Sequence, residues 1–221
     1  MPYTWRFDVA FENFPVLLEG LGVTVLLTVL AMAIGLVGGL ILALMRLSPF
    51  RLLQLPAYGF TEVFRTTPLL VQVVWVFSVL PLTLGITLSP FFSGLVALGC
   101  NVAAFMSEIY RAGISSVGTA QTNAALALGM TRAQSMRRVV LPQAVLRMVP
   151  PIGAMWVALF KDTSVLAAIG VAEMMTKARF IASDTYRPLE IYTLVAVVYF
   201  VITYPQSLGV NHLFQRFRTK E

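Results

Sequence analysis

Gly20–Met45 reads GLGVTVLLTVLAMAIGLVGGLILALM, 26 consecutive residues without a charged side chain. As an α-helix with a rise of about 1.5 Å per residue, this run would be roughly 39 Å long, which is enough to cross a bilayer with some tilt. The whole chain has the same character, since 58% of its 221 residues are hydrophobic and only 12% are charged. A soluble domain has too little interior to bury so many apolar side chains, and a disordered chain has the opposite balance. The sequence therefore predicts an all-α integral membrane protein.

Five apolar stretches are long enough to be transmembrane helices. Thr66–Ser107 is free of charge over 42 residues, which is too long for one helix. Pro81, Gly85 and Pro90 divide it into two spans. The predicted spans are Gly20–Met45, about Ala57–Leu80, about Phe91–Ile109, about Val149–Leu166 and Ile191–Val210.

Small residues recur every four positions in the first span, at Ala31, Gly35, Gly39 and Ala43. This spacing puts a narrow stripe on one helix face, and such stripes let helix backbones approach closely in lipid. We expect the stripe to be a packing surface rather than part of a transport path.

The distribution of charge predicts that the N-terminus is outside and the C-terminus inside. In that orientation the inner segments hold eleven basic and three acidic residues, and the outer segments hold five basic and seven acidic residues. Basic residues are enriched in cytoplasmic loops. The predicted organisation is an extracytoplasmic segment over residues 1–15, a transmembrane domain over 16–214 with an inner loop at about 115–145, and a cytoplasmic tail over 215–221.

The chain offers few residues for metal binding or catalysis. A single cysteine, Cys100, and a single histidine, His212, exclude an internal disulfide and a histidine metal site. A phosphate-binding loop needs Gly-Lys before Ser or Thr, and none of Lys161, Lys177 and Lys220 follows a glycine. We therefore expect no metal, no cofactor and no enzymatic activity on this chain. We also expect no nucleic acid partner, because membrane topology explains its basic residues.

The inner loop between the third and fourth spans predicts two short helices. Gln121–Leu128 is an alanine-rich helix former, and Gly129 is placed to end it. Thr131–Gln134 fits a capping box that starts a second helix reaching about Val140, and Leu141-Pro142 is expected to close the unit. Small side chains on a protruding helix suit insertion into the groove of a partner protein.

The spacing of this loop resembles a known pattern. Asn123-Ala124-Ala125 is followed after three residues by Gly129 and after nine more by Val139-x-Leu141-Pro142. This spacing is similar to that of the EAA loop of permease subunits in ATP-binding cassette importers. The pattern of that family is Glu-Ala-Ala, three residues, Gly, nine residues and Ile-x-Leu-Pro. Asn123 stands where glutamate is usual, which removes a charge that often anchors the loop, and Val139 stands where isoleucine is usual.

Further motifs resemble the polar amino acid branch of these permeases, and the similarity covers roughly Glu19–Phe214. Ala124–Thr131 also resembles glutamate/aspartate permeases. The other motifs are Phe64–Gln72 (FRTTPLLVQ), Ser107–Ile114 (SEIYRAGI), Val140–Ala144 (VLPQA) and Lys161–Val165 (KDTSV).

The resemblance implies the type I importer permease fold and a passive translocation role. In such importers two permease subunits, identical or paralogous, combine with a dimer of cytoplasmic ATPases that bind ATP and magnesium. An extracytoplasmic binding protein delivers the amino acid, which crosses the bacterial cytoplasmic (inner) membrane by alternating access. The EAA loop lies in a groove of the ATPase, so closure on ATP moves the spans. The ATPase-coupling residues implied here are Asn123, Ala124, Ala125, Gly129, Leu141 and Pro142.

Polar residues inside the spans are candidates for the path of the solute. Lys161 and Asp162 interrupt the fourth span and offer both charge signs to an amino acid, or else the span ends early and both are in water. Gln72 and Asn101 are further candidates, with interhelical hydrogen bonding as the alternative.

Two Glu-x-x-Arg pairs, Glu62/Arg65 and Glu108/Arg111, are expected near the inner membrane face. Each pair is one helical turn apart, so it either neutralises charge within its own helix or belongs to a gate network or a solute contact.

A stand-alone secondary carrier or channel for small polar solutes is the alternative function, but it gives the inner loop no purpose. A membrane enzyme would require a catalytic cluster, which one histidine, one cysteine and scattered acids do not supply.

Overall fold

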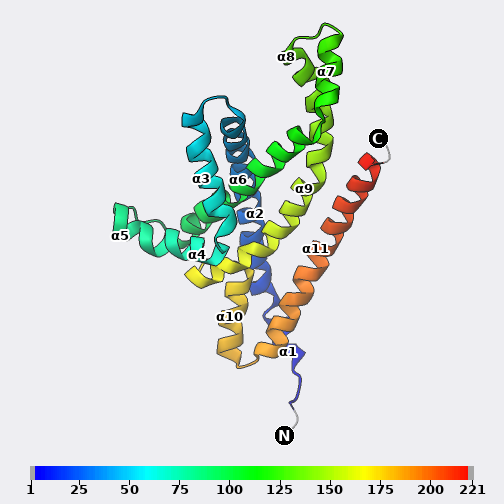
Figure 1. Cartoon of the computed structure of the whole chain (residues 1–221). Helices are drawn as coiled ribbons and strands as arrows, with labels where there is room; N and C mark the ends of the chain where they lie inside the picture. Colours follow the sequence, from blue (N-terminus) through cyan, green and yellow to red (C-terminus); the bar gives the residue numbers. More distant parts are fainter. Residues whose placement is uncertain (1–2, 219–221) are drawn as a thin grey trace.

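The computed structural model describes residues 3–218 and consists of helices joined by short turns (Figure 1). Among these residues no strand occurs, and residues 219–221 of the predicted cytoplasmic tail lie outside the described part. The α-helices are α1 (Phe7–Glu12), α2 (Phe14–Leu47), α3 (Arg51–Thr66), α4 (Leu69–Val74), α5 (Leu80–Leu84), α6 (Pro90–Ser116), α7 (Thr119–Ala127), α8 (Arg132–Ser135), α9 (Leu141–Asp162), α10 (Met174–Thr185) and α11 (Pro188–Arg218). Two π-helical turns, η1 (Trp75–Val79) and η2 (Met136–Val140), and one 3-10 helix, η3 (Thr163–Ile169), connect some of them.

Four helical stretches in the described residues are long and apolar enough to cross a membrane. They are α2, α6, the continuous helix Arg132–Ile169, and Pro188–His212 of α11. A fifth candidate is the pair of α3 with the α4–α5 arm (Leu69–Leu84), whose two halves are bent by 112°. The predicted number of five spans therefore requires this bent pair to count as one.

The second span is not the continuous helix predicted over about Ala57–Leu80. The helix stops at Thr66, and Thr67 (ψ 145°) and Pro68 (ψ 136°) are extended. The ring of a proline disfavours α-helical geometry in the residue before it, which is the physical reason for the break.

Two prolines that were expected to end or divide helices lie inside them instead. Pro142 is the second residue of α9, so the prediction that Leu141-Pro142 closes the inner loop is wrong, and Pro81 lies in α5. In both places a π-helical turn precedes the proline by one residue. The backbone N–H of that residue bonds the carbonyl five positions earlier, as Leu141 does to Met136 and Leu80 to Trp75. The wider turn accommodates the proline ring, which also lacks an N–H donor. The break between the second and third spans lies at residues 85–89, where Gly85 has φ +69°.

α2 and α6 pack closely along the predicted stripe of small residues. A Cβ added to Gly35 would overlap the side chain of Val102, and one added to Gly39 would overlap Met106 and come 2.9 Å from the carbonyl oxygen of Ala103. The packing role predicted for the stripe is therefore confirmed.

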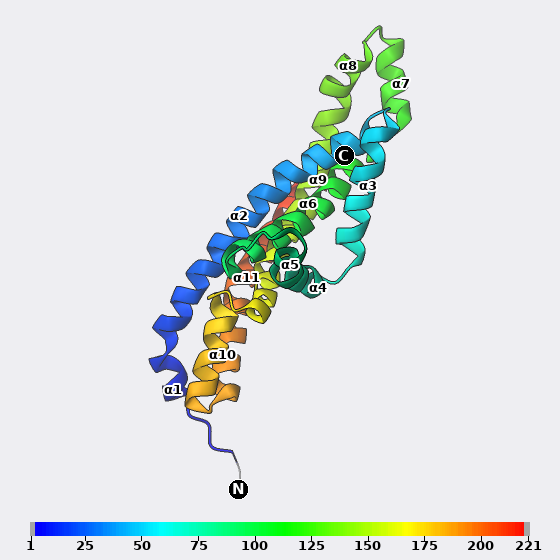
Figure 2. The ribbon, with the colours of Figure 1, turned by 90° about the vertical axis from the view of Figure 1, so that its left-hand side faces the viewer.

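A projection, which we call the knob (Thr119–Val140), extends past the other helices at one end of the molecule (Figures 1 and 2). Its base is a small apolar cluster of Val117, Val140, Ala144 and Met148. Because α8, η2, α9 and η3 form one continuous helix, the knob is joined to the fourth span without a loop.

The opposite end of the molecule has its own core, formed by α1, α10 and the beginnings of α2 and α11 (Figure 2). Ala10, Met174 and Ile191 are fully buried there. Glu173 is also fully buried and caps α10 by accepting the backbone N–H groups of Met175 (2.8 Å) and Thr176 (2.6 Å). The segment after the fourth span, whose conformation the sequence left open, thus folds into η3 and α10.

Candidate functional site

The first helix of the knob ends at Gly129, as predicted. Gly129 has φ +81°, and its N–H bonds the Leu126 carbonyl at 3.0 Å, while the N–H of Met130 bonds the Ala125 carbonyl at 3.1 Å. This pair of bonds is the Schellman motif, in which a glycine takes the left-handed conformation that other residues adopt only with strain.

The second helix of the knob starts with the predicted capping box. The N–H of Gln134 donates to Thr131 Oγ1 at 3.2 Å, and the N–H of Thr131 donates to Gln134 Oε1 at 2.9 Å. The two bonds satisfy donors that a helix N-terminus otherwise leaves free, so they stabilise the start of the second knob helix at this position.

The six predicted coupling residues divide into those of the tip and those of the neck of the knob. Asn123, Ala124 and Gly129 are exposed on the tip, whereas Ala125 is buried between the knob helices. Leu141 and Pro142 are exposed at the neck. The sequence did not single out Leu128, whose side chain is 81% exposed at the tip beside Gly129. An exposed leucine on a rigid protrusion suits an apolar groove in a partner.

The two predicted Glu–Arg pairs form one network that joins α2, α3 and α6. Glu108 accepts hydrogen bonds from Arg111 of its own helix and from Arg46 of α2 at 3.0 Å. Arg65 lies 3.7 Å from Glu108 and 3.7 Å from Glu62, and so connects α3. Arg46 was missed, although it is the first charge after the run Gly20–Met45.

Gln72 and Asn101 lie together at the break between α3 and α4. The side-chain nitrogens of Gln72 and Asn101 both donate to the carbonyl of Phe64, at 2.8 and 3.1 Å, and Asn101 also donates to Gln72 Oε1 at 3.0 Å. In a continuous helix the Phe64 carbonyl would accept the N–H of residue 68, which is a proline and has none. The two amides therefore satisfy the carbonyl that the break exposes. These contacts correspond to interhelical hydrogen bonding, the alternative to a place on the solute path.

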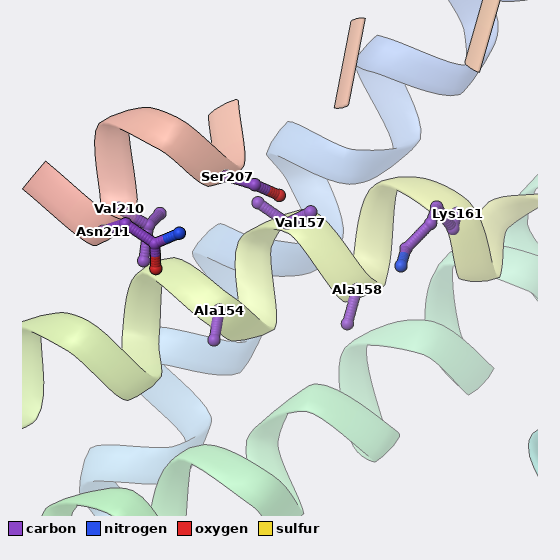
Figure 3. A pocket seen from close by; sticks show the side chains of 7 residues that line it. All are labelled: Ala154, Val157, Ala158, Lys161, Ser207, Val210 and Asn211. Carbon is purple, nitrogen blue, oxygen red and sulfur yellow. The ribbon is translucent and has the colours of Figure 1, made fainter. Parts of the chain in front are cut away.

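Lys161 lines a pocket of about 270 Å³ between α9 and α11 (Figure 3). Lys161 is exposed, whereas its neighbour Asp162 is half-buried and is not among the residues that line this pocket. Ser207 and Asn211 of α11 supply the other polar groups (Figure 3), and the sequence analysis did not single them out. The remaining lining residues are Ala154, Val157, Ala158 and Val210.

A hydrogen bond from Trp156 Nε1 to Gln206 Oε1, at 3.0 Å, holds α9 and α11 together beside this pocket. In the part of the chain that the structure describes, no group of three or more His, Cys, Asp and Glu side chains is arranged to hold a metal ion. The pocket therefore offers one ammonium group, a hydroxyl and an amide between two apolar helices, a set that suits a small polar solute with a carboxylate.

Comparison with known sequences places the chain among transport proteins. Residues 35–219 match the family described as binding-protein-dependent transport system inner membrane component. The chain is 36% identical over 209 residues to the probable glutamine ABC transporter permease protein GlnM of Bacillus subtilis, covering 95% of this chain and 96% of that protein. It is 38% identical over 221 residues to the glutamate/aspartate import permease protein GltK of Escherichia coli O6:H1, covering 97% and 99%.

The fold agrees with these sequence relatives. A crystal structure of an amino acid ABC transporter with histidines superposes with a TM-score of 0.92 at 37% identity, covering 97% of this chain and 100% of that one. An inward-facing structure of the MetNI methionine ABC transporter shares the fold with a TM-score of 0.70 at 19% identity, covering 91% and 98%. The chain belongs to the binding-protein-dependent transport system inner membrane components, and within them to the permease subunits of polar amino acid ABC importers.

Proposed function

We propose that this chain is the translocation subunit of an ATP-driven, binding-protein-dependent importer, and that it carries a polar amino acid across the bacterial cytoplasmic membrane by alternating access. The observation that carries the proposal is the knob, a rigid and exposed two-helix unit that continues without a loop into a transmembrane helix. The N-terminus is outside and the C-terminus inside in this proposal, so the knob lies in the cytoplasm.

The continuous helix gives a physical route from ATP hydrolysis to the membrane. An ATPase dimer binds ATP and magnesium, and the groove of one ATPase holds the knob tip around Asn123, Ala124 and Gly129. When the ATPases close, the knob moves with its groove, and the movement passes into Arg132–Ile169, which no loop interrupts and which contains Pro150 and Pro151 between the knob and Lys161. Lys161 lies in the same helix, so movement at the knob reaches the pocket directly.

The pocket between α9 and α11 is proposed as part of the solute path in this subunit. Every α-amino acid has a carboxylate that can pair with the Lys161 ammonium, and Ser207 and Asn211 can bind its polar groups. Relatives named for glutamine and for glutamate/aspartate support a polar amino acid as the solute. A second permease subunit, identical or paralogous, completes the path, and an extracytoplasmic binding protein delivers the amino acid.

Reconstitution tests this function. The chain is placed in proteoliposomes with its ATPase, its partner permease and its binding protein, and ATP hydrolysis is measured across a panel of amino acids. One class of liganded binding protein should stimulate hydrolysis and drive uptake. Gly129→Asp should release or uncouple the ATPase, reducing stimulated hydrolysis at least tenfold, because it puts a side chain and a charge at a left-handed position of the knob tip.

Gly118→Asp is the matched control, because Gly118 is the N-cap residue directly before the knob, also has open space around its Cα, and has φ −57°, which aspartate adopts freely. Normal ATP-dependent uptake by Gly129→Asp would contradict the coupling role of the knob. Uptake by the chain without any ATPase would favour a stand-alone carrier or channel instead.

A further inference from the structure

The charges of the knob are of one sign. Arg132, Arg137 and Arg138 lie on it, and no aspartate or glutamate occurs between Glu108 and Asp162. All three arginines are exposed, and none of their side chains has a hydrogen bond, an ion pair or an aromatic contact within residues 3–218. The knob is therefore a cationic surface without an internal counter-charge.

Three other basic residues near the same end of the molecule have an acidic partner within the chain. Arg46, Arg65 and Arg111 all contact Glu108, whose carboxylate lies at the centre of the three. Arg132, by contrast, is the first residue of α8, where a positive charge opposes the helix dipole and weakens the helix slightly. The knob arginines thus bring the isolated chain no electrostatic gain.

The tip of the knob lies away from the helices that are long and apolar enough to cross a membrane. The knob extends beyond the α2–α3 connection and the end of α11 (Figures 1 and 2). Attraction to anionic lipid headgroups falls off within about 10 Å of the surface at ordinary salt. A protein surface that surrounds the knob is the better counter-charge.

We propose that the ATPase groove that receives the knob carries carboxylates facing Arg132, Arg137 and Arg138, so that docking of this subunit depends on charge. This inference rests on the proposed function and specifies the chemistry of the partner surface. Leu128 and the small residues of the tip fill the groove, and the arginines pair with acidic residues at its rim, where charges fix orientation and association rate.

The test measures how tightly the purified ATPase binds the permease in nanodiscs at about 50 mM and about 500 mM NaCl. Wild-type affinity should fall on the order of tenfold at high salt, the effect expected of three exposed ion pairs of ordinary strength. The triple variant Arg132→Gln/Arg137→Gln/Arg138→Gln should bind about tenfold more weakly at low salt and like wild type at high salt. Arg51→Gln is the matched control, since Arg51 is an exposed cation near the same end of the molecule but outside the knob, and it should change nothing.

Each outcome has a separate meaning. If the ATPase binds wild type and the triple variant equally at both salt concentrations, the acidic groove is wrong and the importer function stands. If the difference appears only in nanodiscs that contain anionic lipid, the arginines bind the membrane and the inference is overturned. If the ATPase does not bind wild type at any salt concentration, the inference and the proposed function both fail.

Discussion

Glu108 is the residue on which three helices depend electrostatically. It contacts Arg46 of α2, Arg65 of α3 and Arg111 of α6, and the Arg46 side chain is only 9% exposed. Replacing this carboxylate by an amide would leave three guanidinium groups close together with Glu62 as the remaining acid of the network. A charge in such a partly buried position is costly when its partner is removed.

We therefore expect Glu108→Gln to lower the free energy of unfolding by roughly 2–4 kcal/mol, since removal of one partner of a well-buried pair costs about 3–5 kcal/mol and this network is partly exposed. Thermal unfolding in detergent measures the change. Glu62→Gln is the control, because Glu62 has a single contact with Arg65 at 3.7 Å and should cost less than about 1 kcal/mol. Equal effects of the two substitutions would show that Glu108 is not the centre of the network.

The same scale explains why Gln72 and Asn101 could be identified as unusual but not assigned from sequence. An amide in an apolar helix marks a need for hydrogen bonding, but its partner is not visible in the sequence. The partner is the Phe64 carbonyl, which Pro68 leaves free, 37 positions from Asn101. The sequence shows the local cause, Pro68, directly. The Asn101 side chain that bonds the free carbonyl comes from another helix, so the sequence does not show it.

At the scale of the elements, the close contact of α2 with α6 depends on glycines, which have no Cβ atom. Gly39 lies against the backbone of α6, and a Cβ at this position would come 2.9 Å from the Ala103 carbonyl oxygen. Backbone cannot rotate away as a flexible side chain does, so a larger residue must separate the helices.

Gly39→Leu should lower the free energy of unfolding by about 3 kcal/mol, at the upper end for overpacking, or prevent assembly in the membrane. Unfolding in detergent and the yield of folded protein measure the effect. Gly22→Leu, in the same helix but with open space around its Cα, should be close to neutral. The packing argument is wrong if the two variants unfold alike.

At the scale of the whole molecule, one continuous helix connects the knob to the pocket of Lys161. Arg132–Ile169 joins the proposed ATPase contact to Lys161, so its stiffness is part of the proposed mechanism. Val145 and Leu146 lie between the two ends and are exposed, so they can be replaced without a cavity.

Val145→Gly/Leu146→Gly should soften the helix, because each glycine costs about 1 kcal/mol of helix propensity relative to alanine. We expect the ATPase still to bind, while amino acid uptake per ATP hydrolysed falls several-fold. Val145→Ala/Leu146→Ala removes the same side chains and keeps the helix stiff, so it should retain coupling. Unchanged coupling in the glycine variant would show that the movement travels by another route.

Much of the architecture is contained in local sequence. Hydropathy marks the apolar stretches, and the glycine, threonine and glutamine of the knob specify a Schellman motif and a capping box, because turn and cap chemistry involves residues only a few positions apart. The prediction at Leu141-Pro142 was wrong for a related reason, since a proline near a helix start ends the helix only when no wider turn absorbs it.

The sequence by itself determined that the chain is an all-helical membrane protein, that it has a two-helix loop between its third and fourth apolar stretches, and which family it resembles. Tertiary structure alone decided the meeting of Asn101 with the Phe64 carbonyl at the break of the second span, the meeting of Arg46 with Glu108, and the pocket of Lys161, Ser207 and Asn211. The physical reason is range. Hydropathy, caps and turns are properties of neighbouring residues, whereas an ion pair or a pocket depends on which helix faces settle against each other.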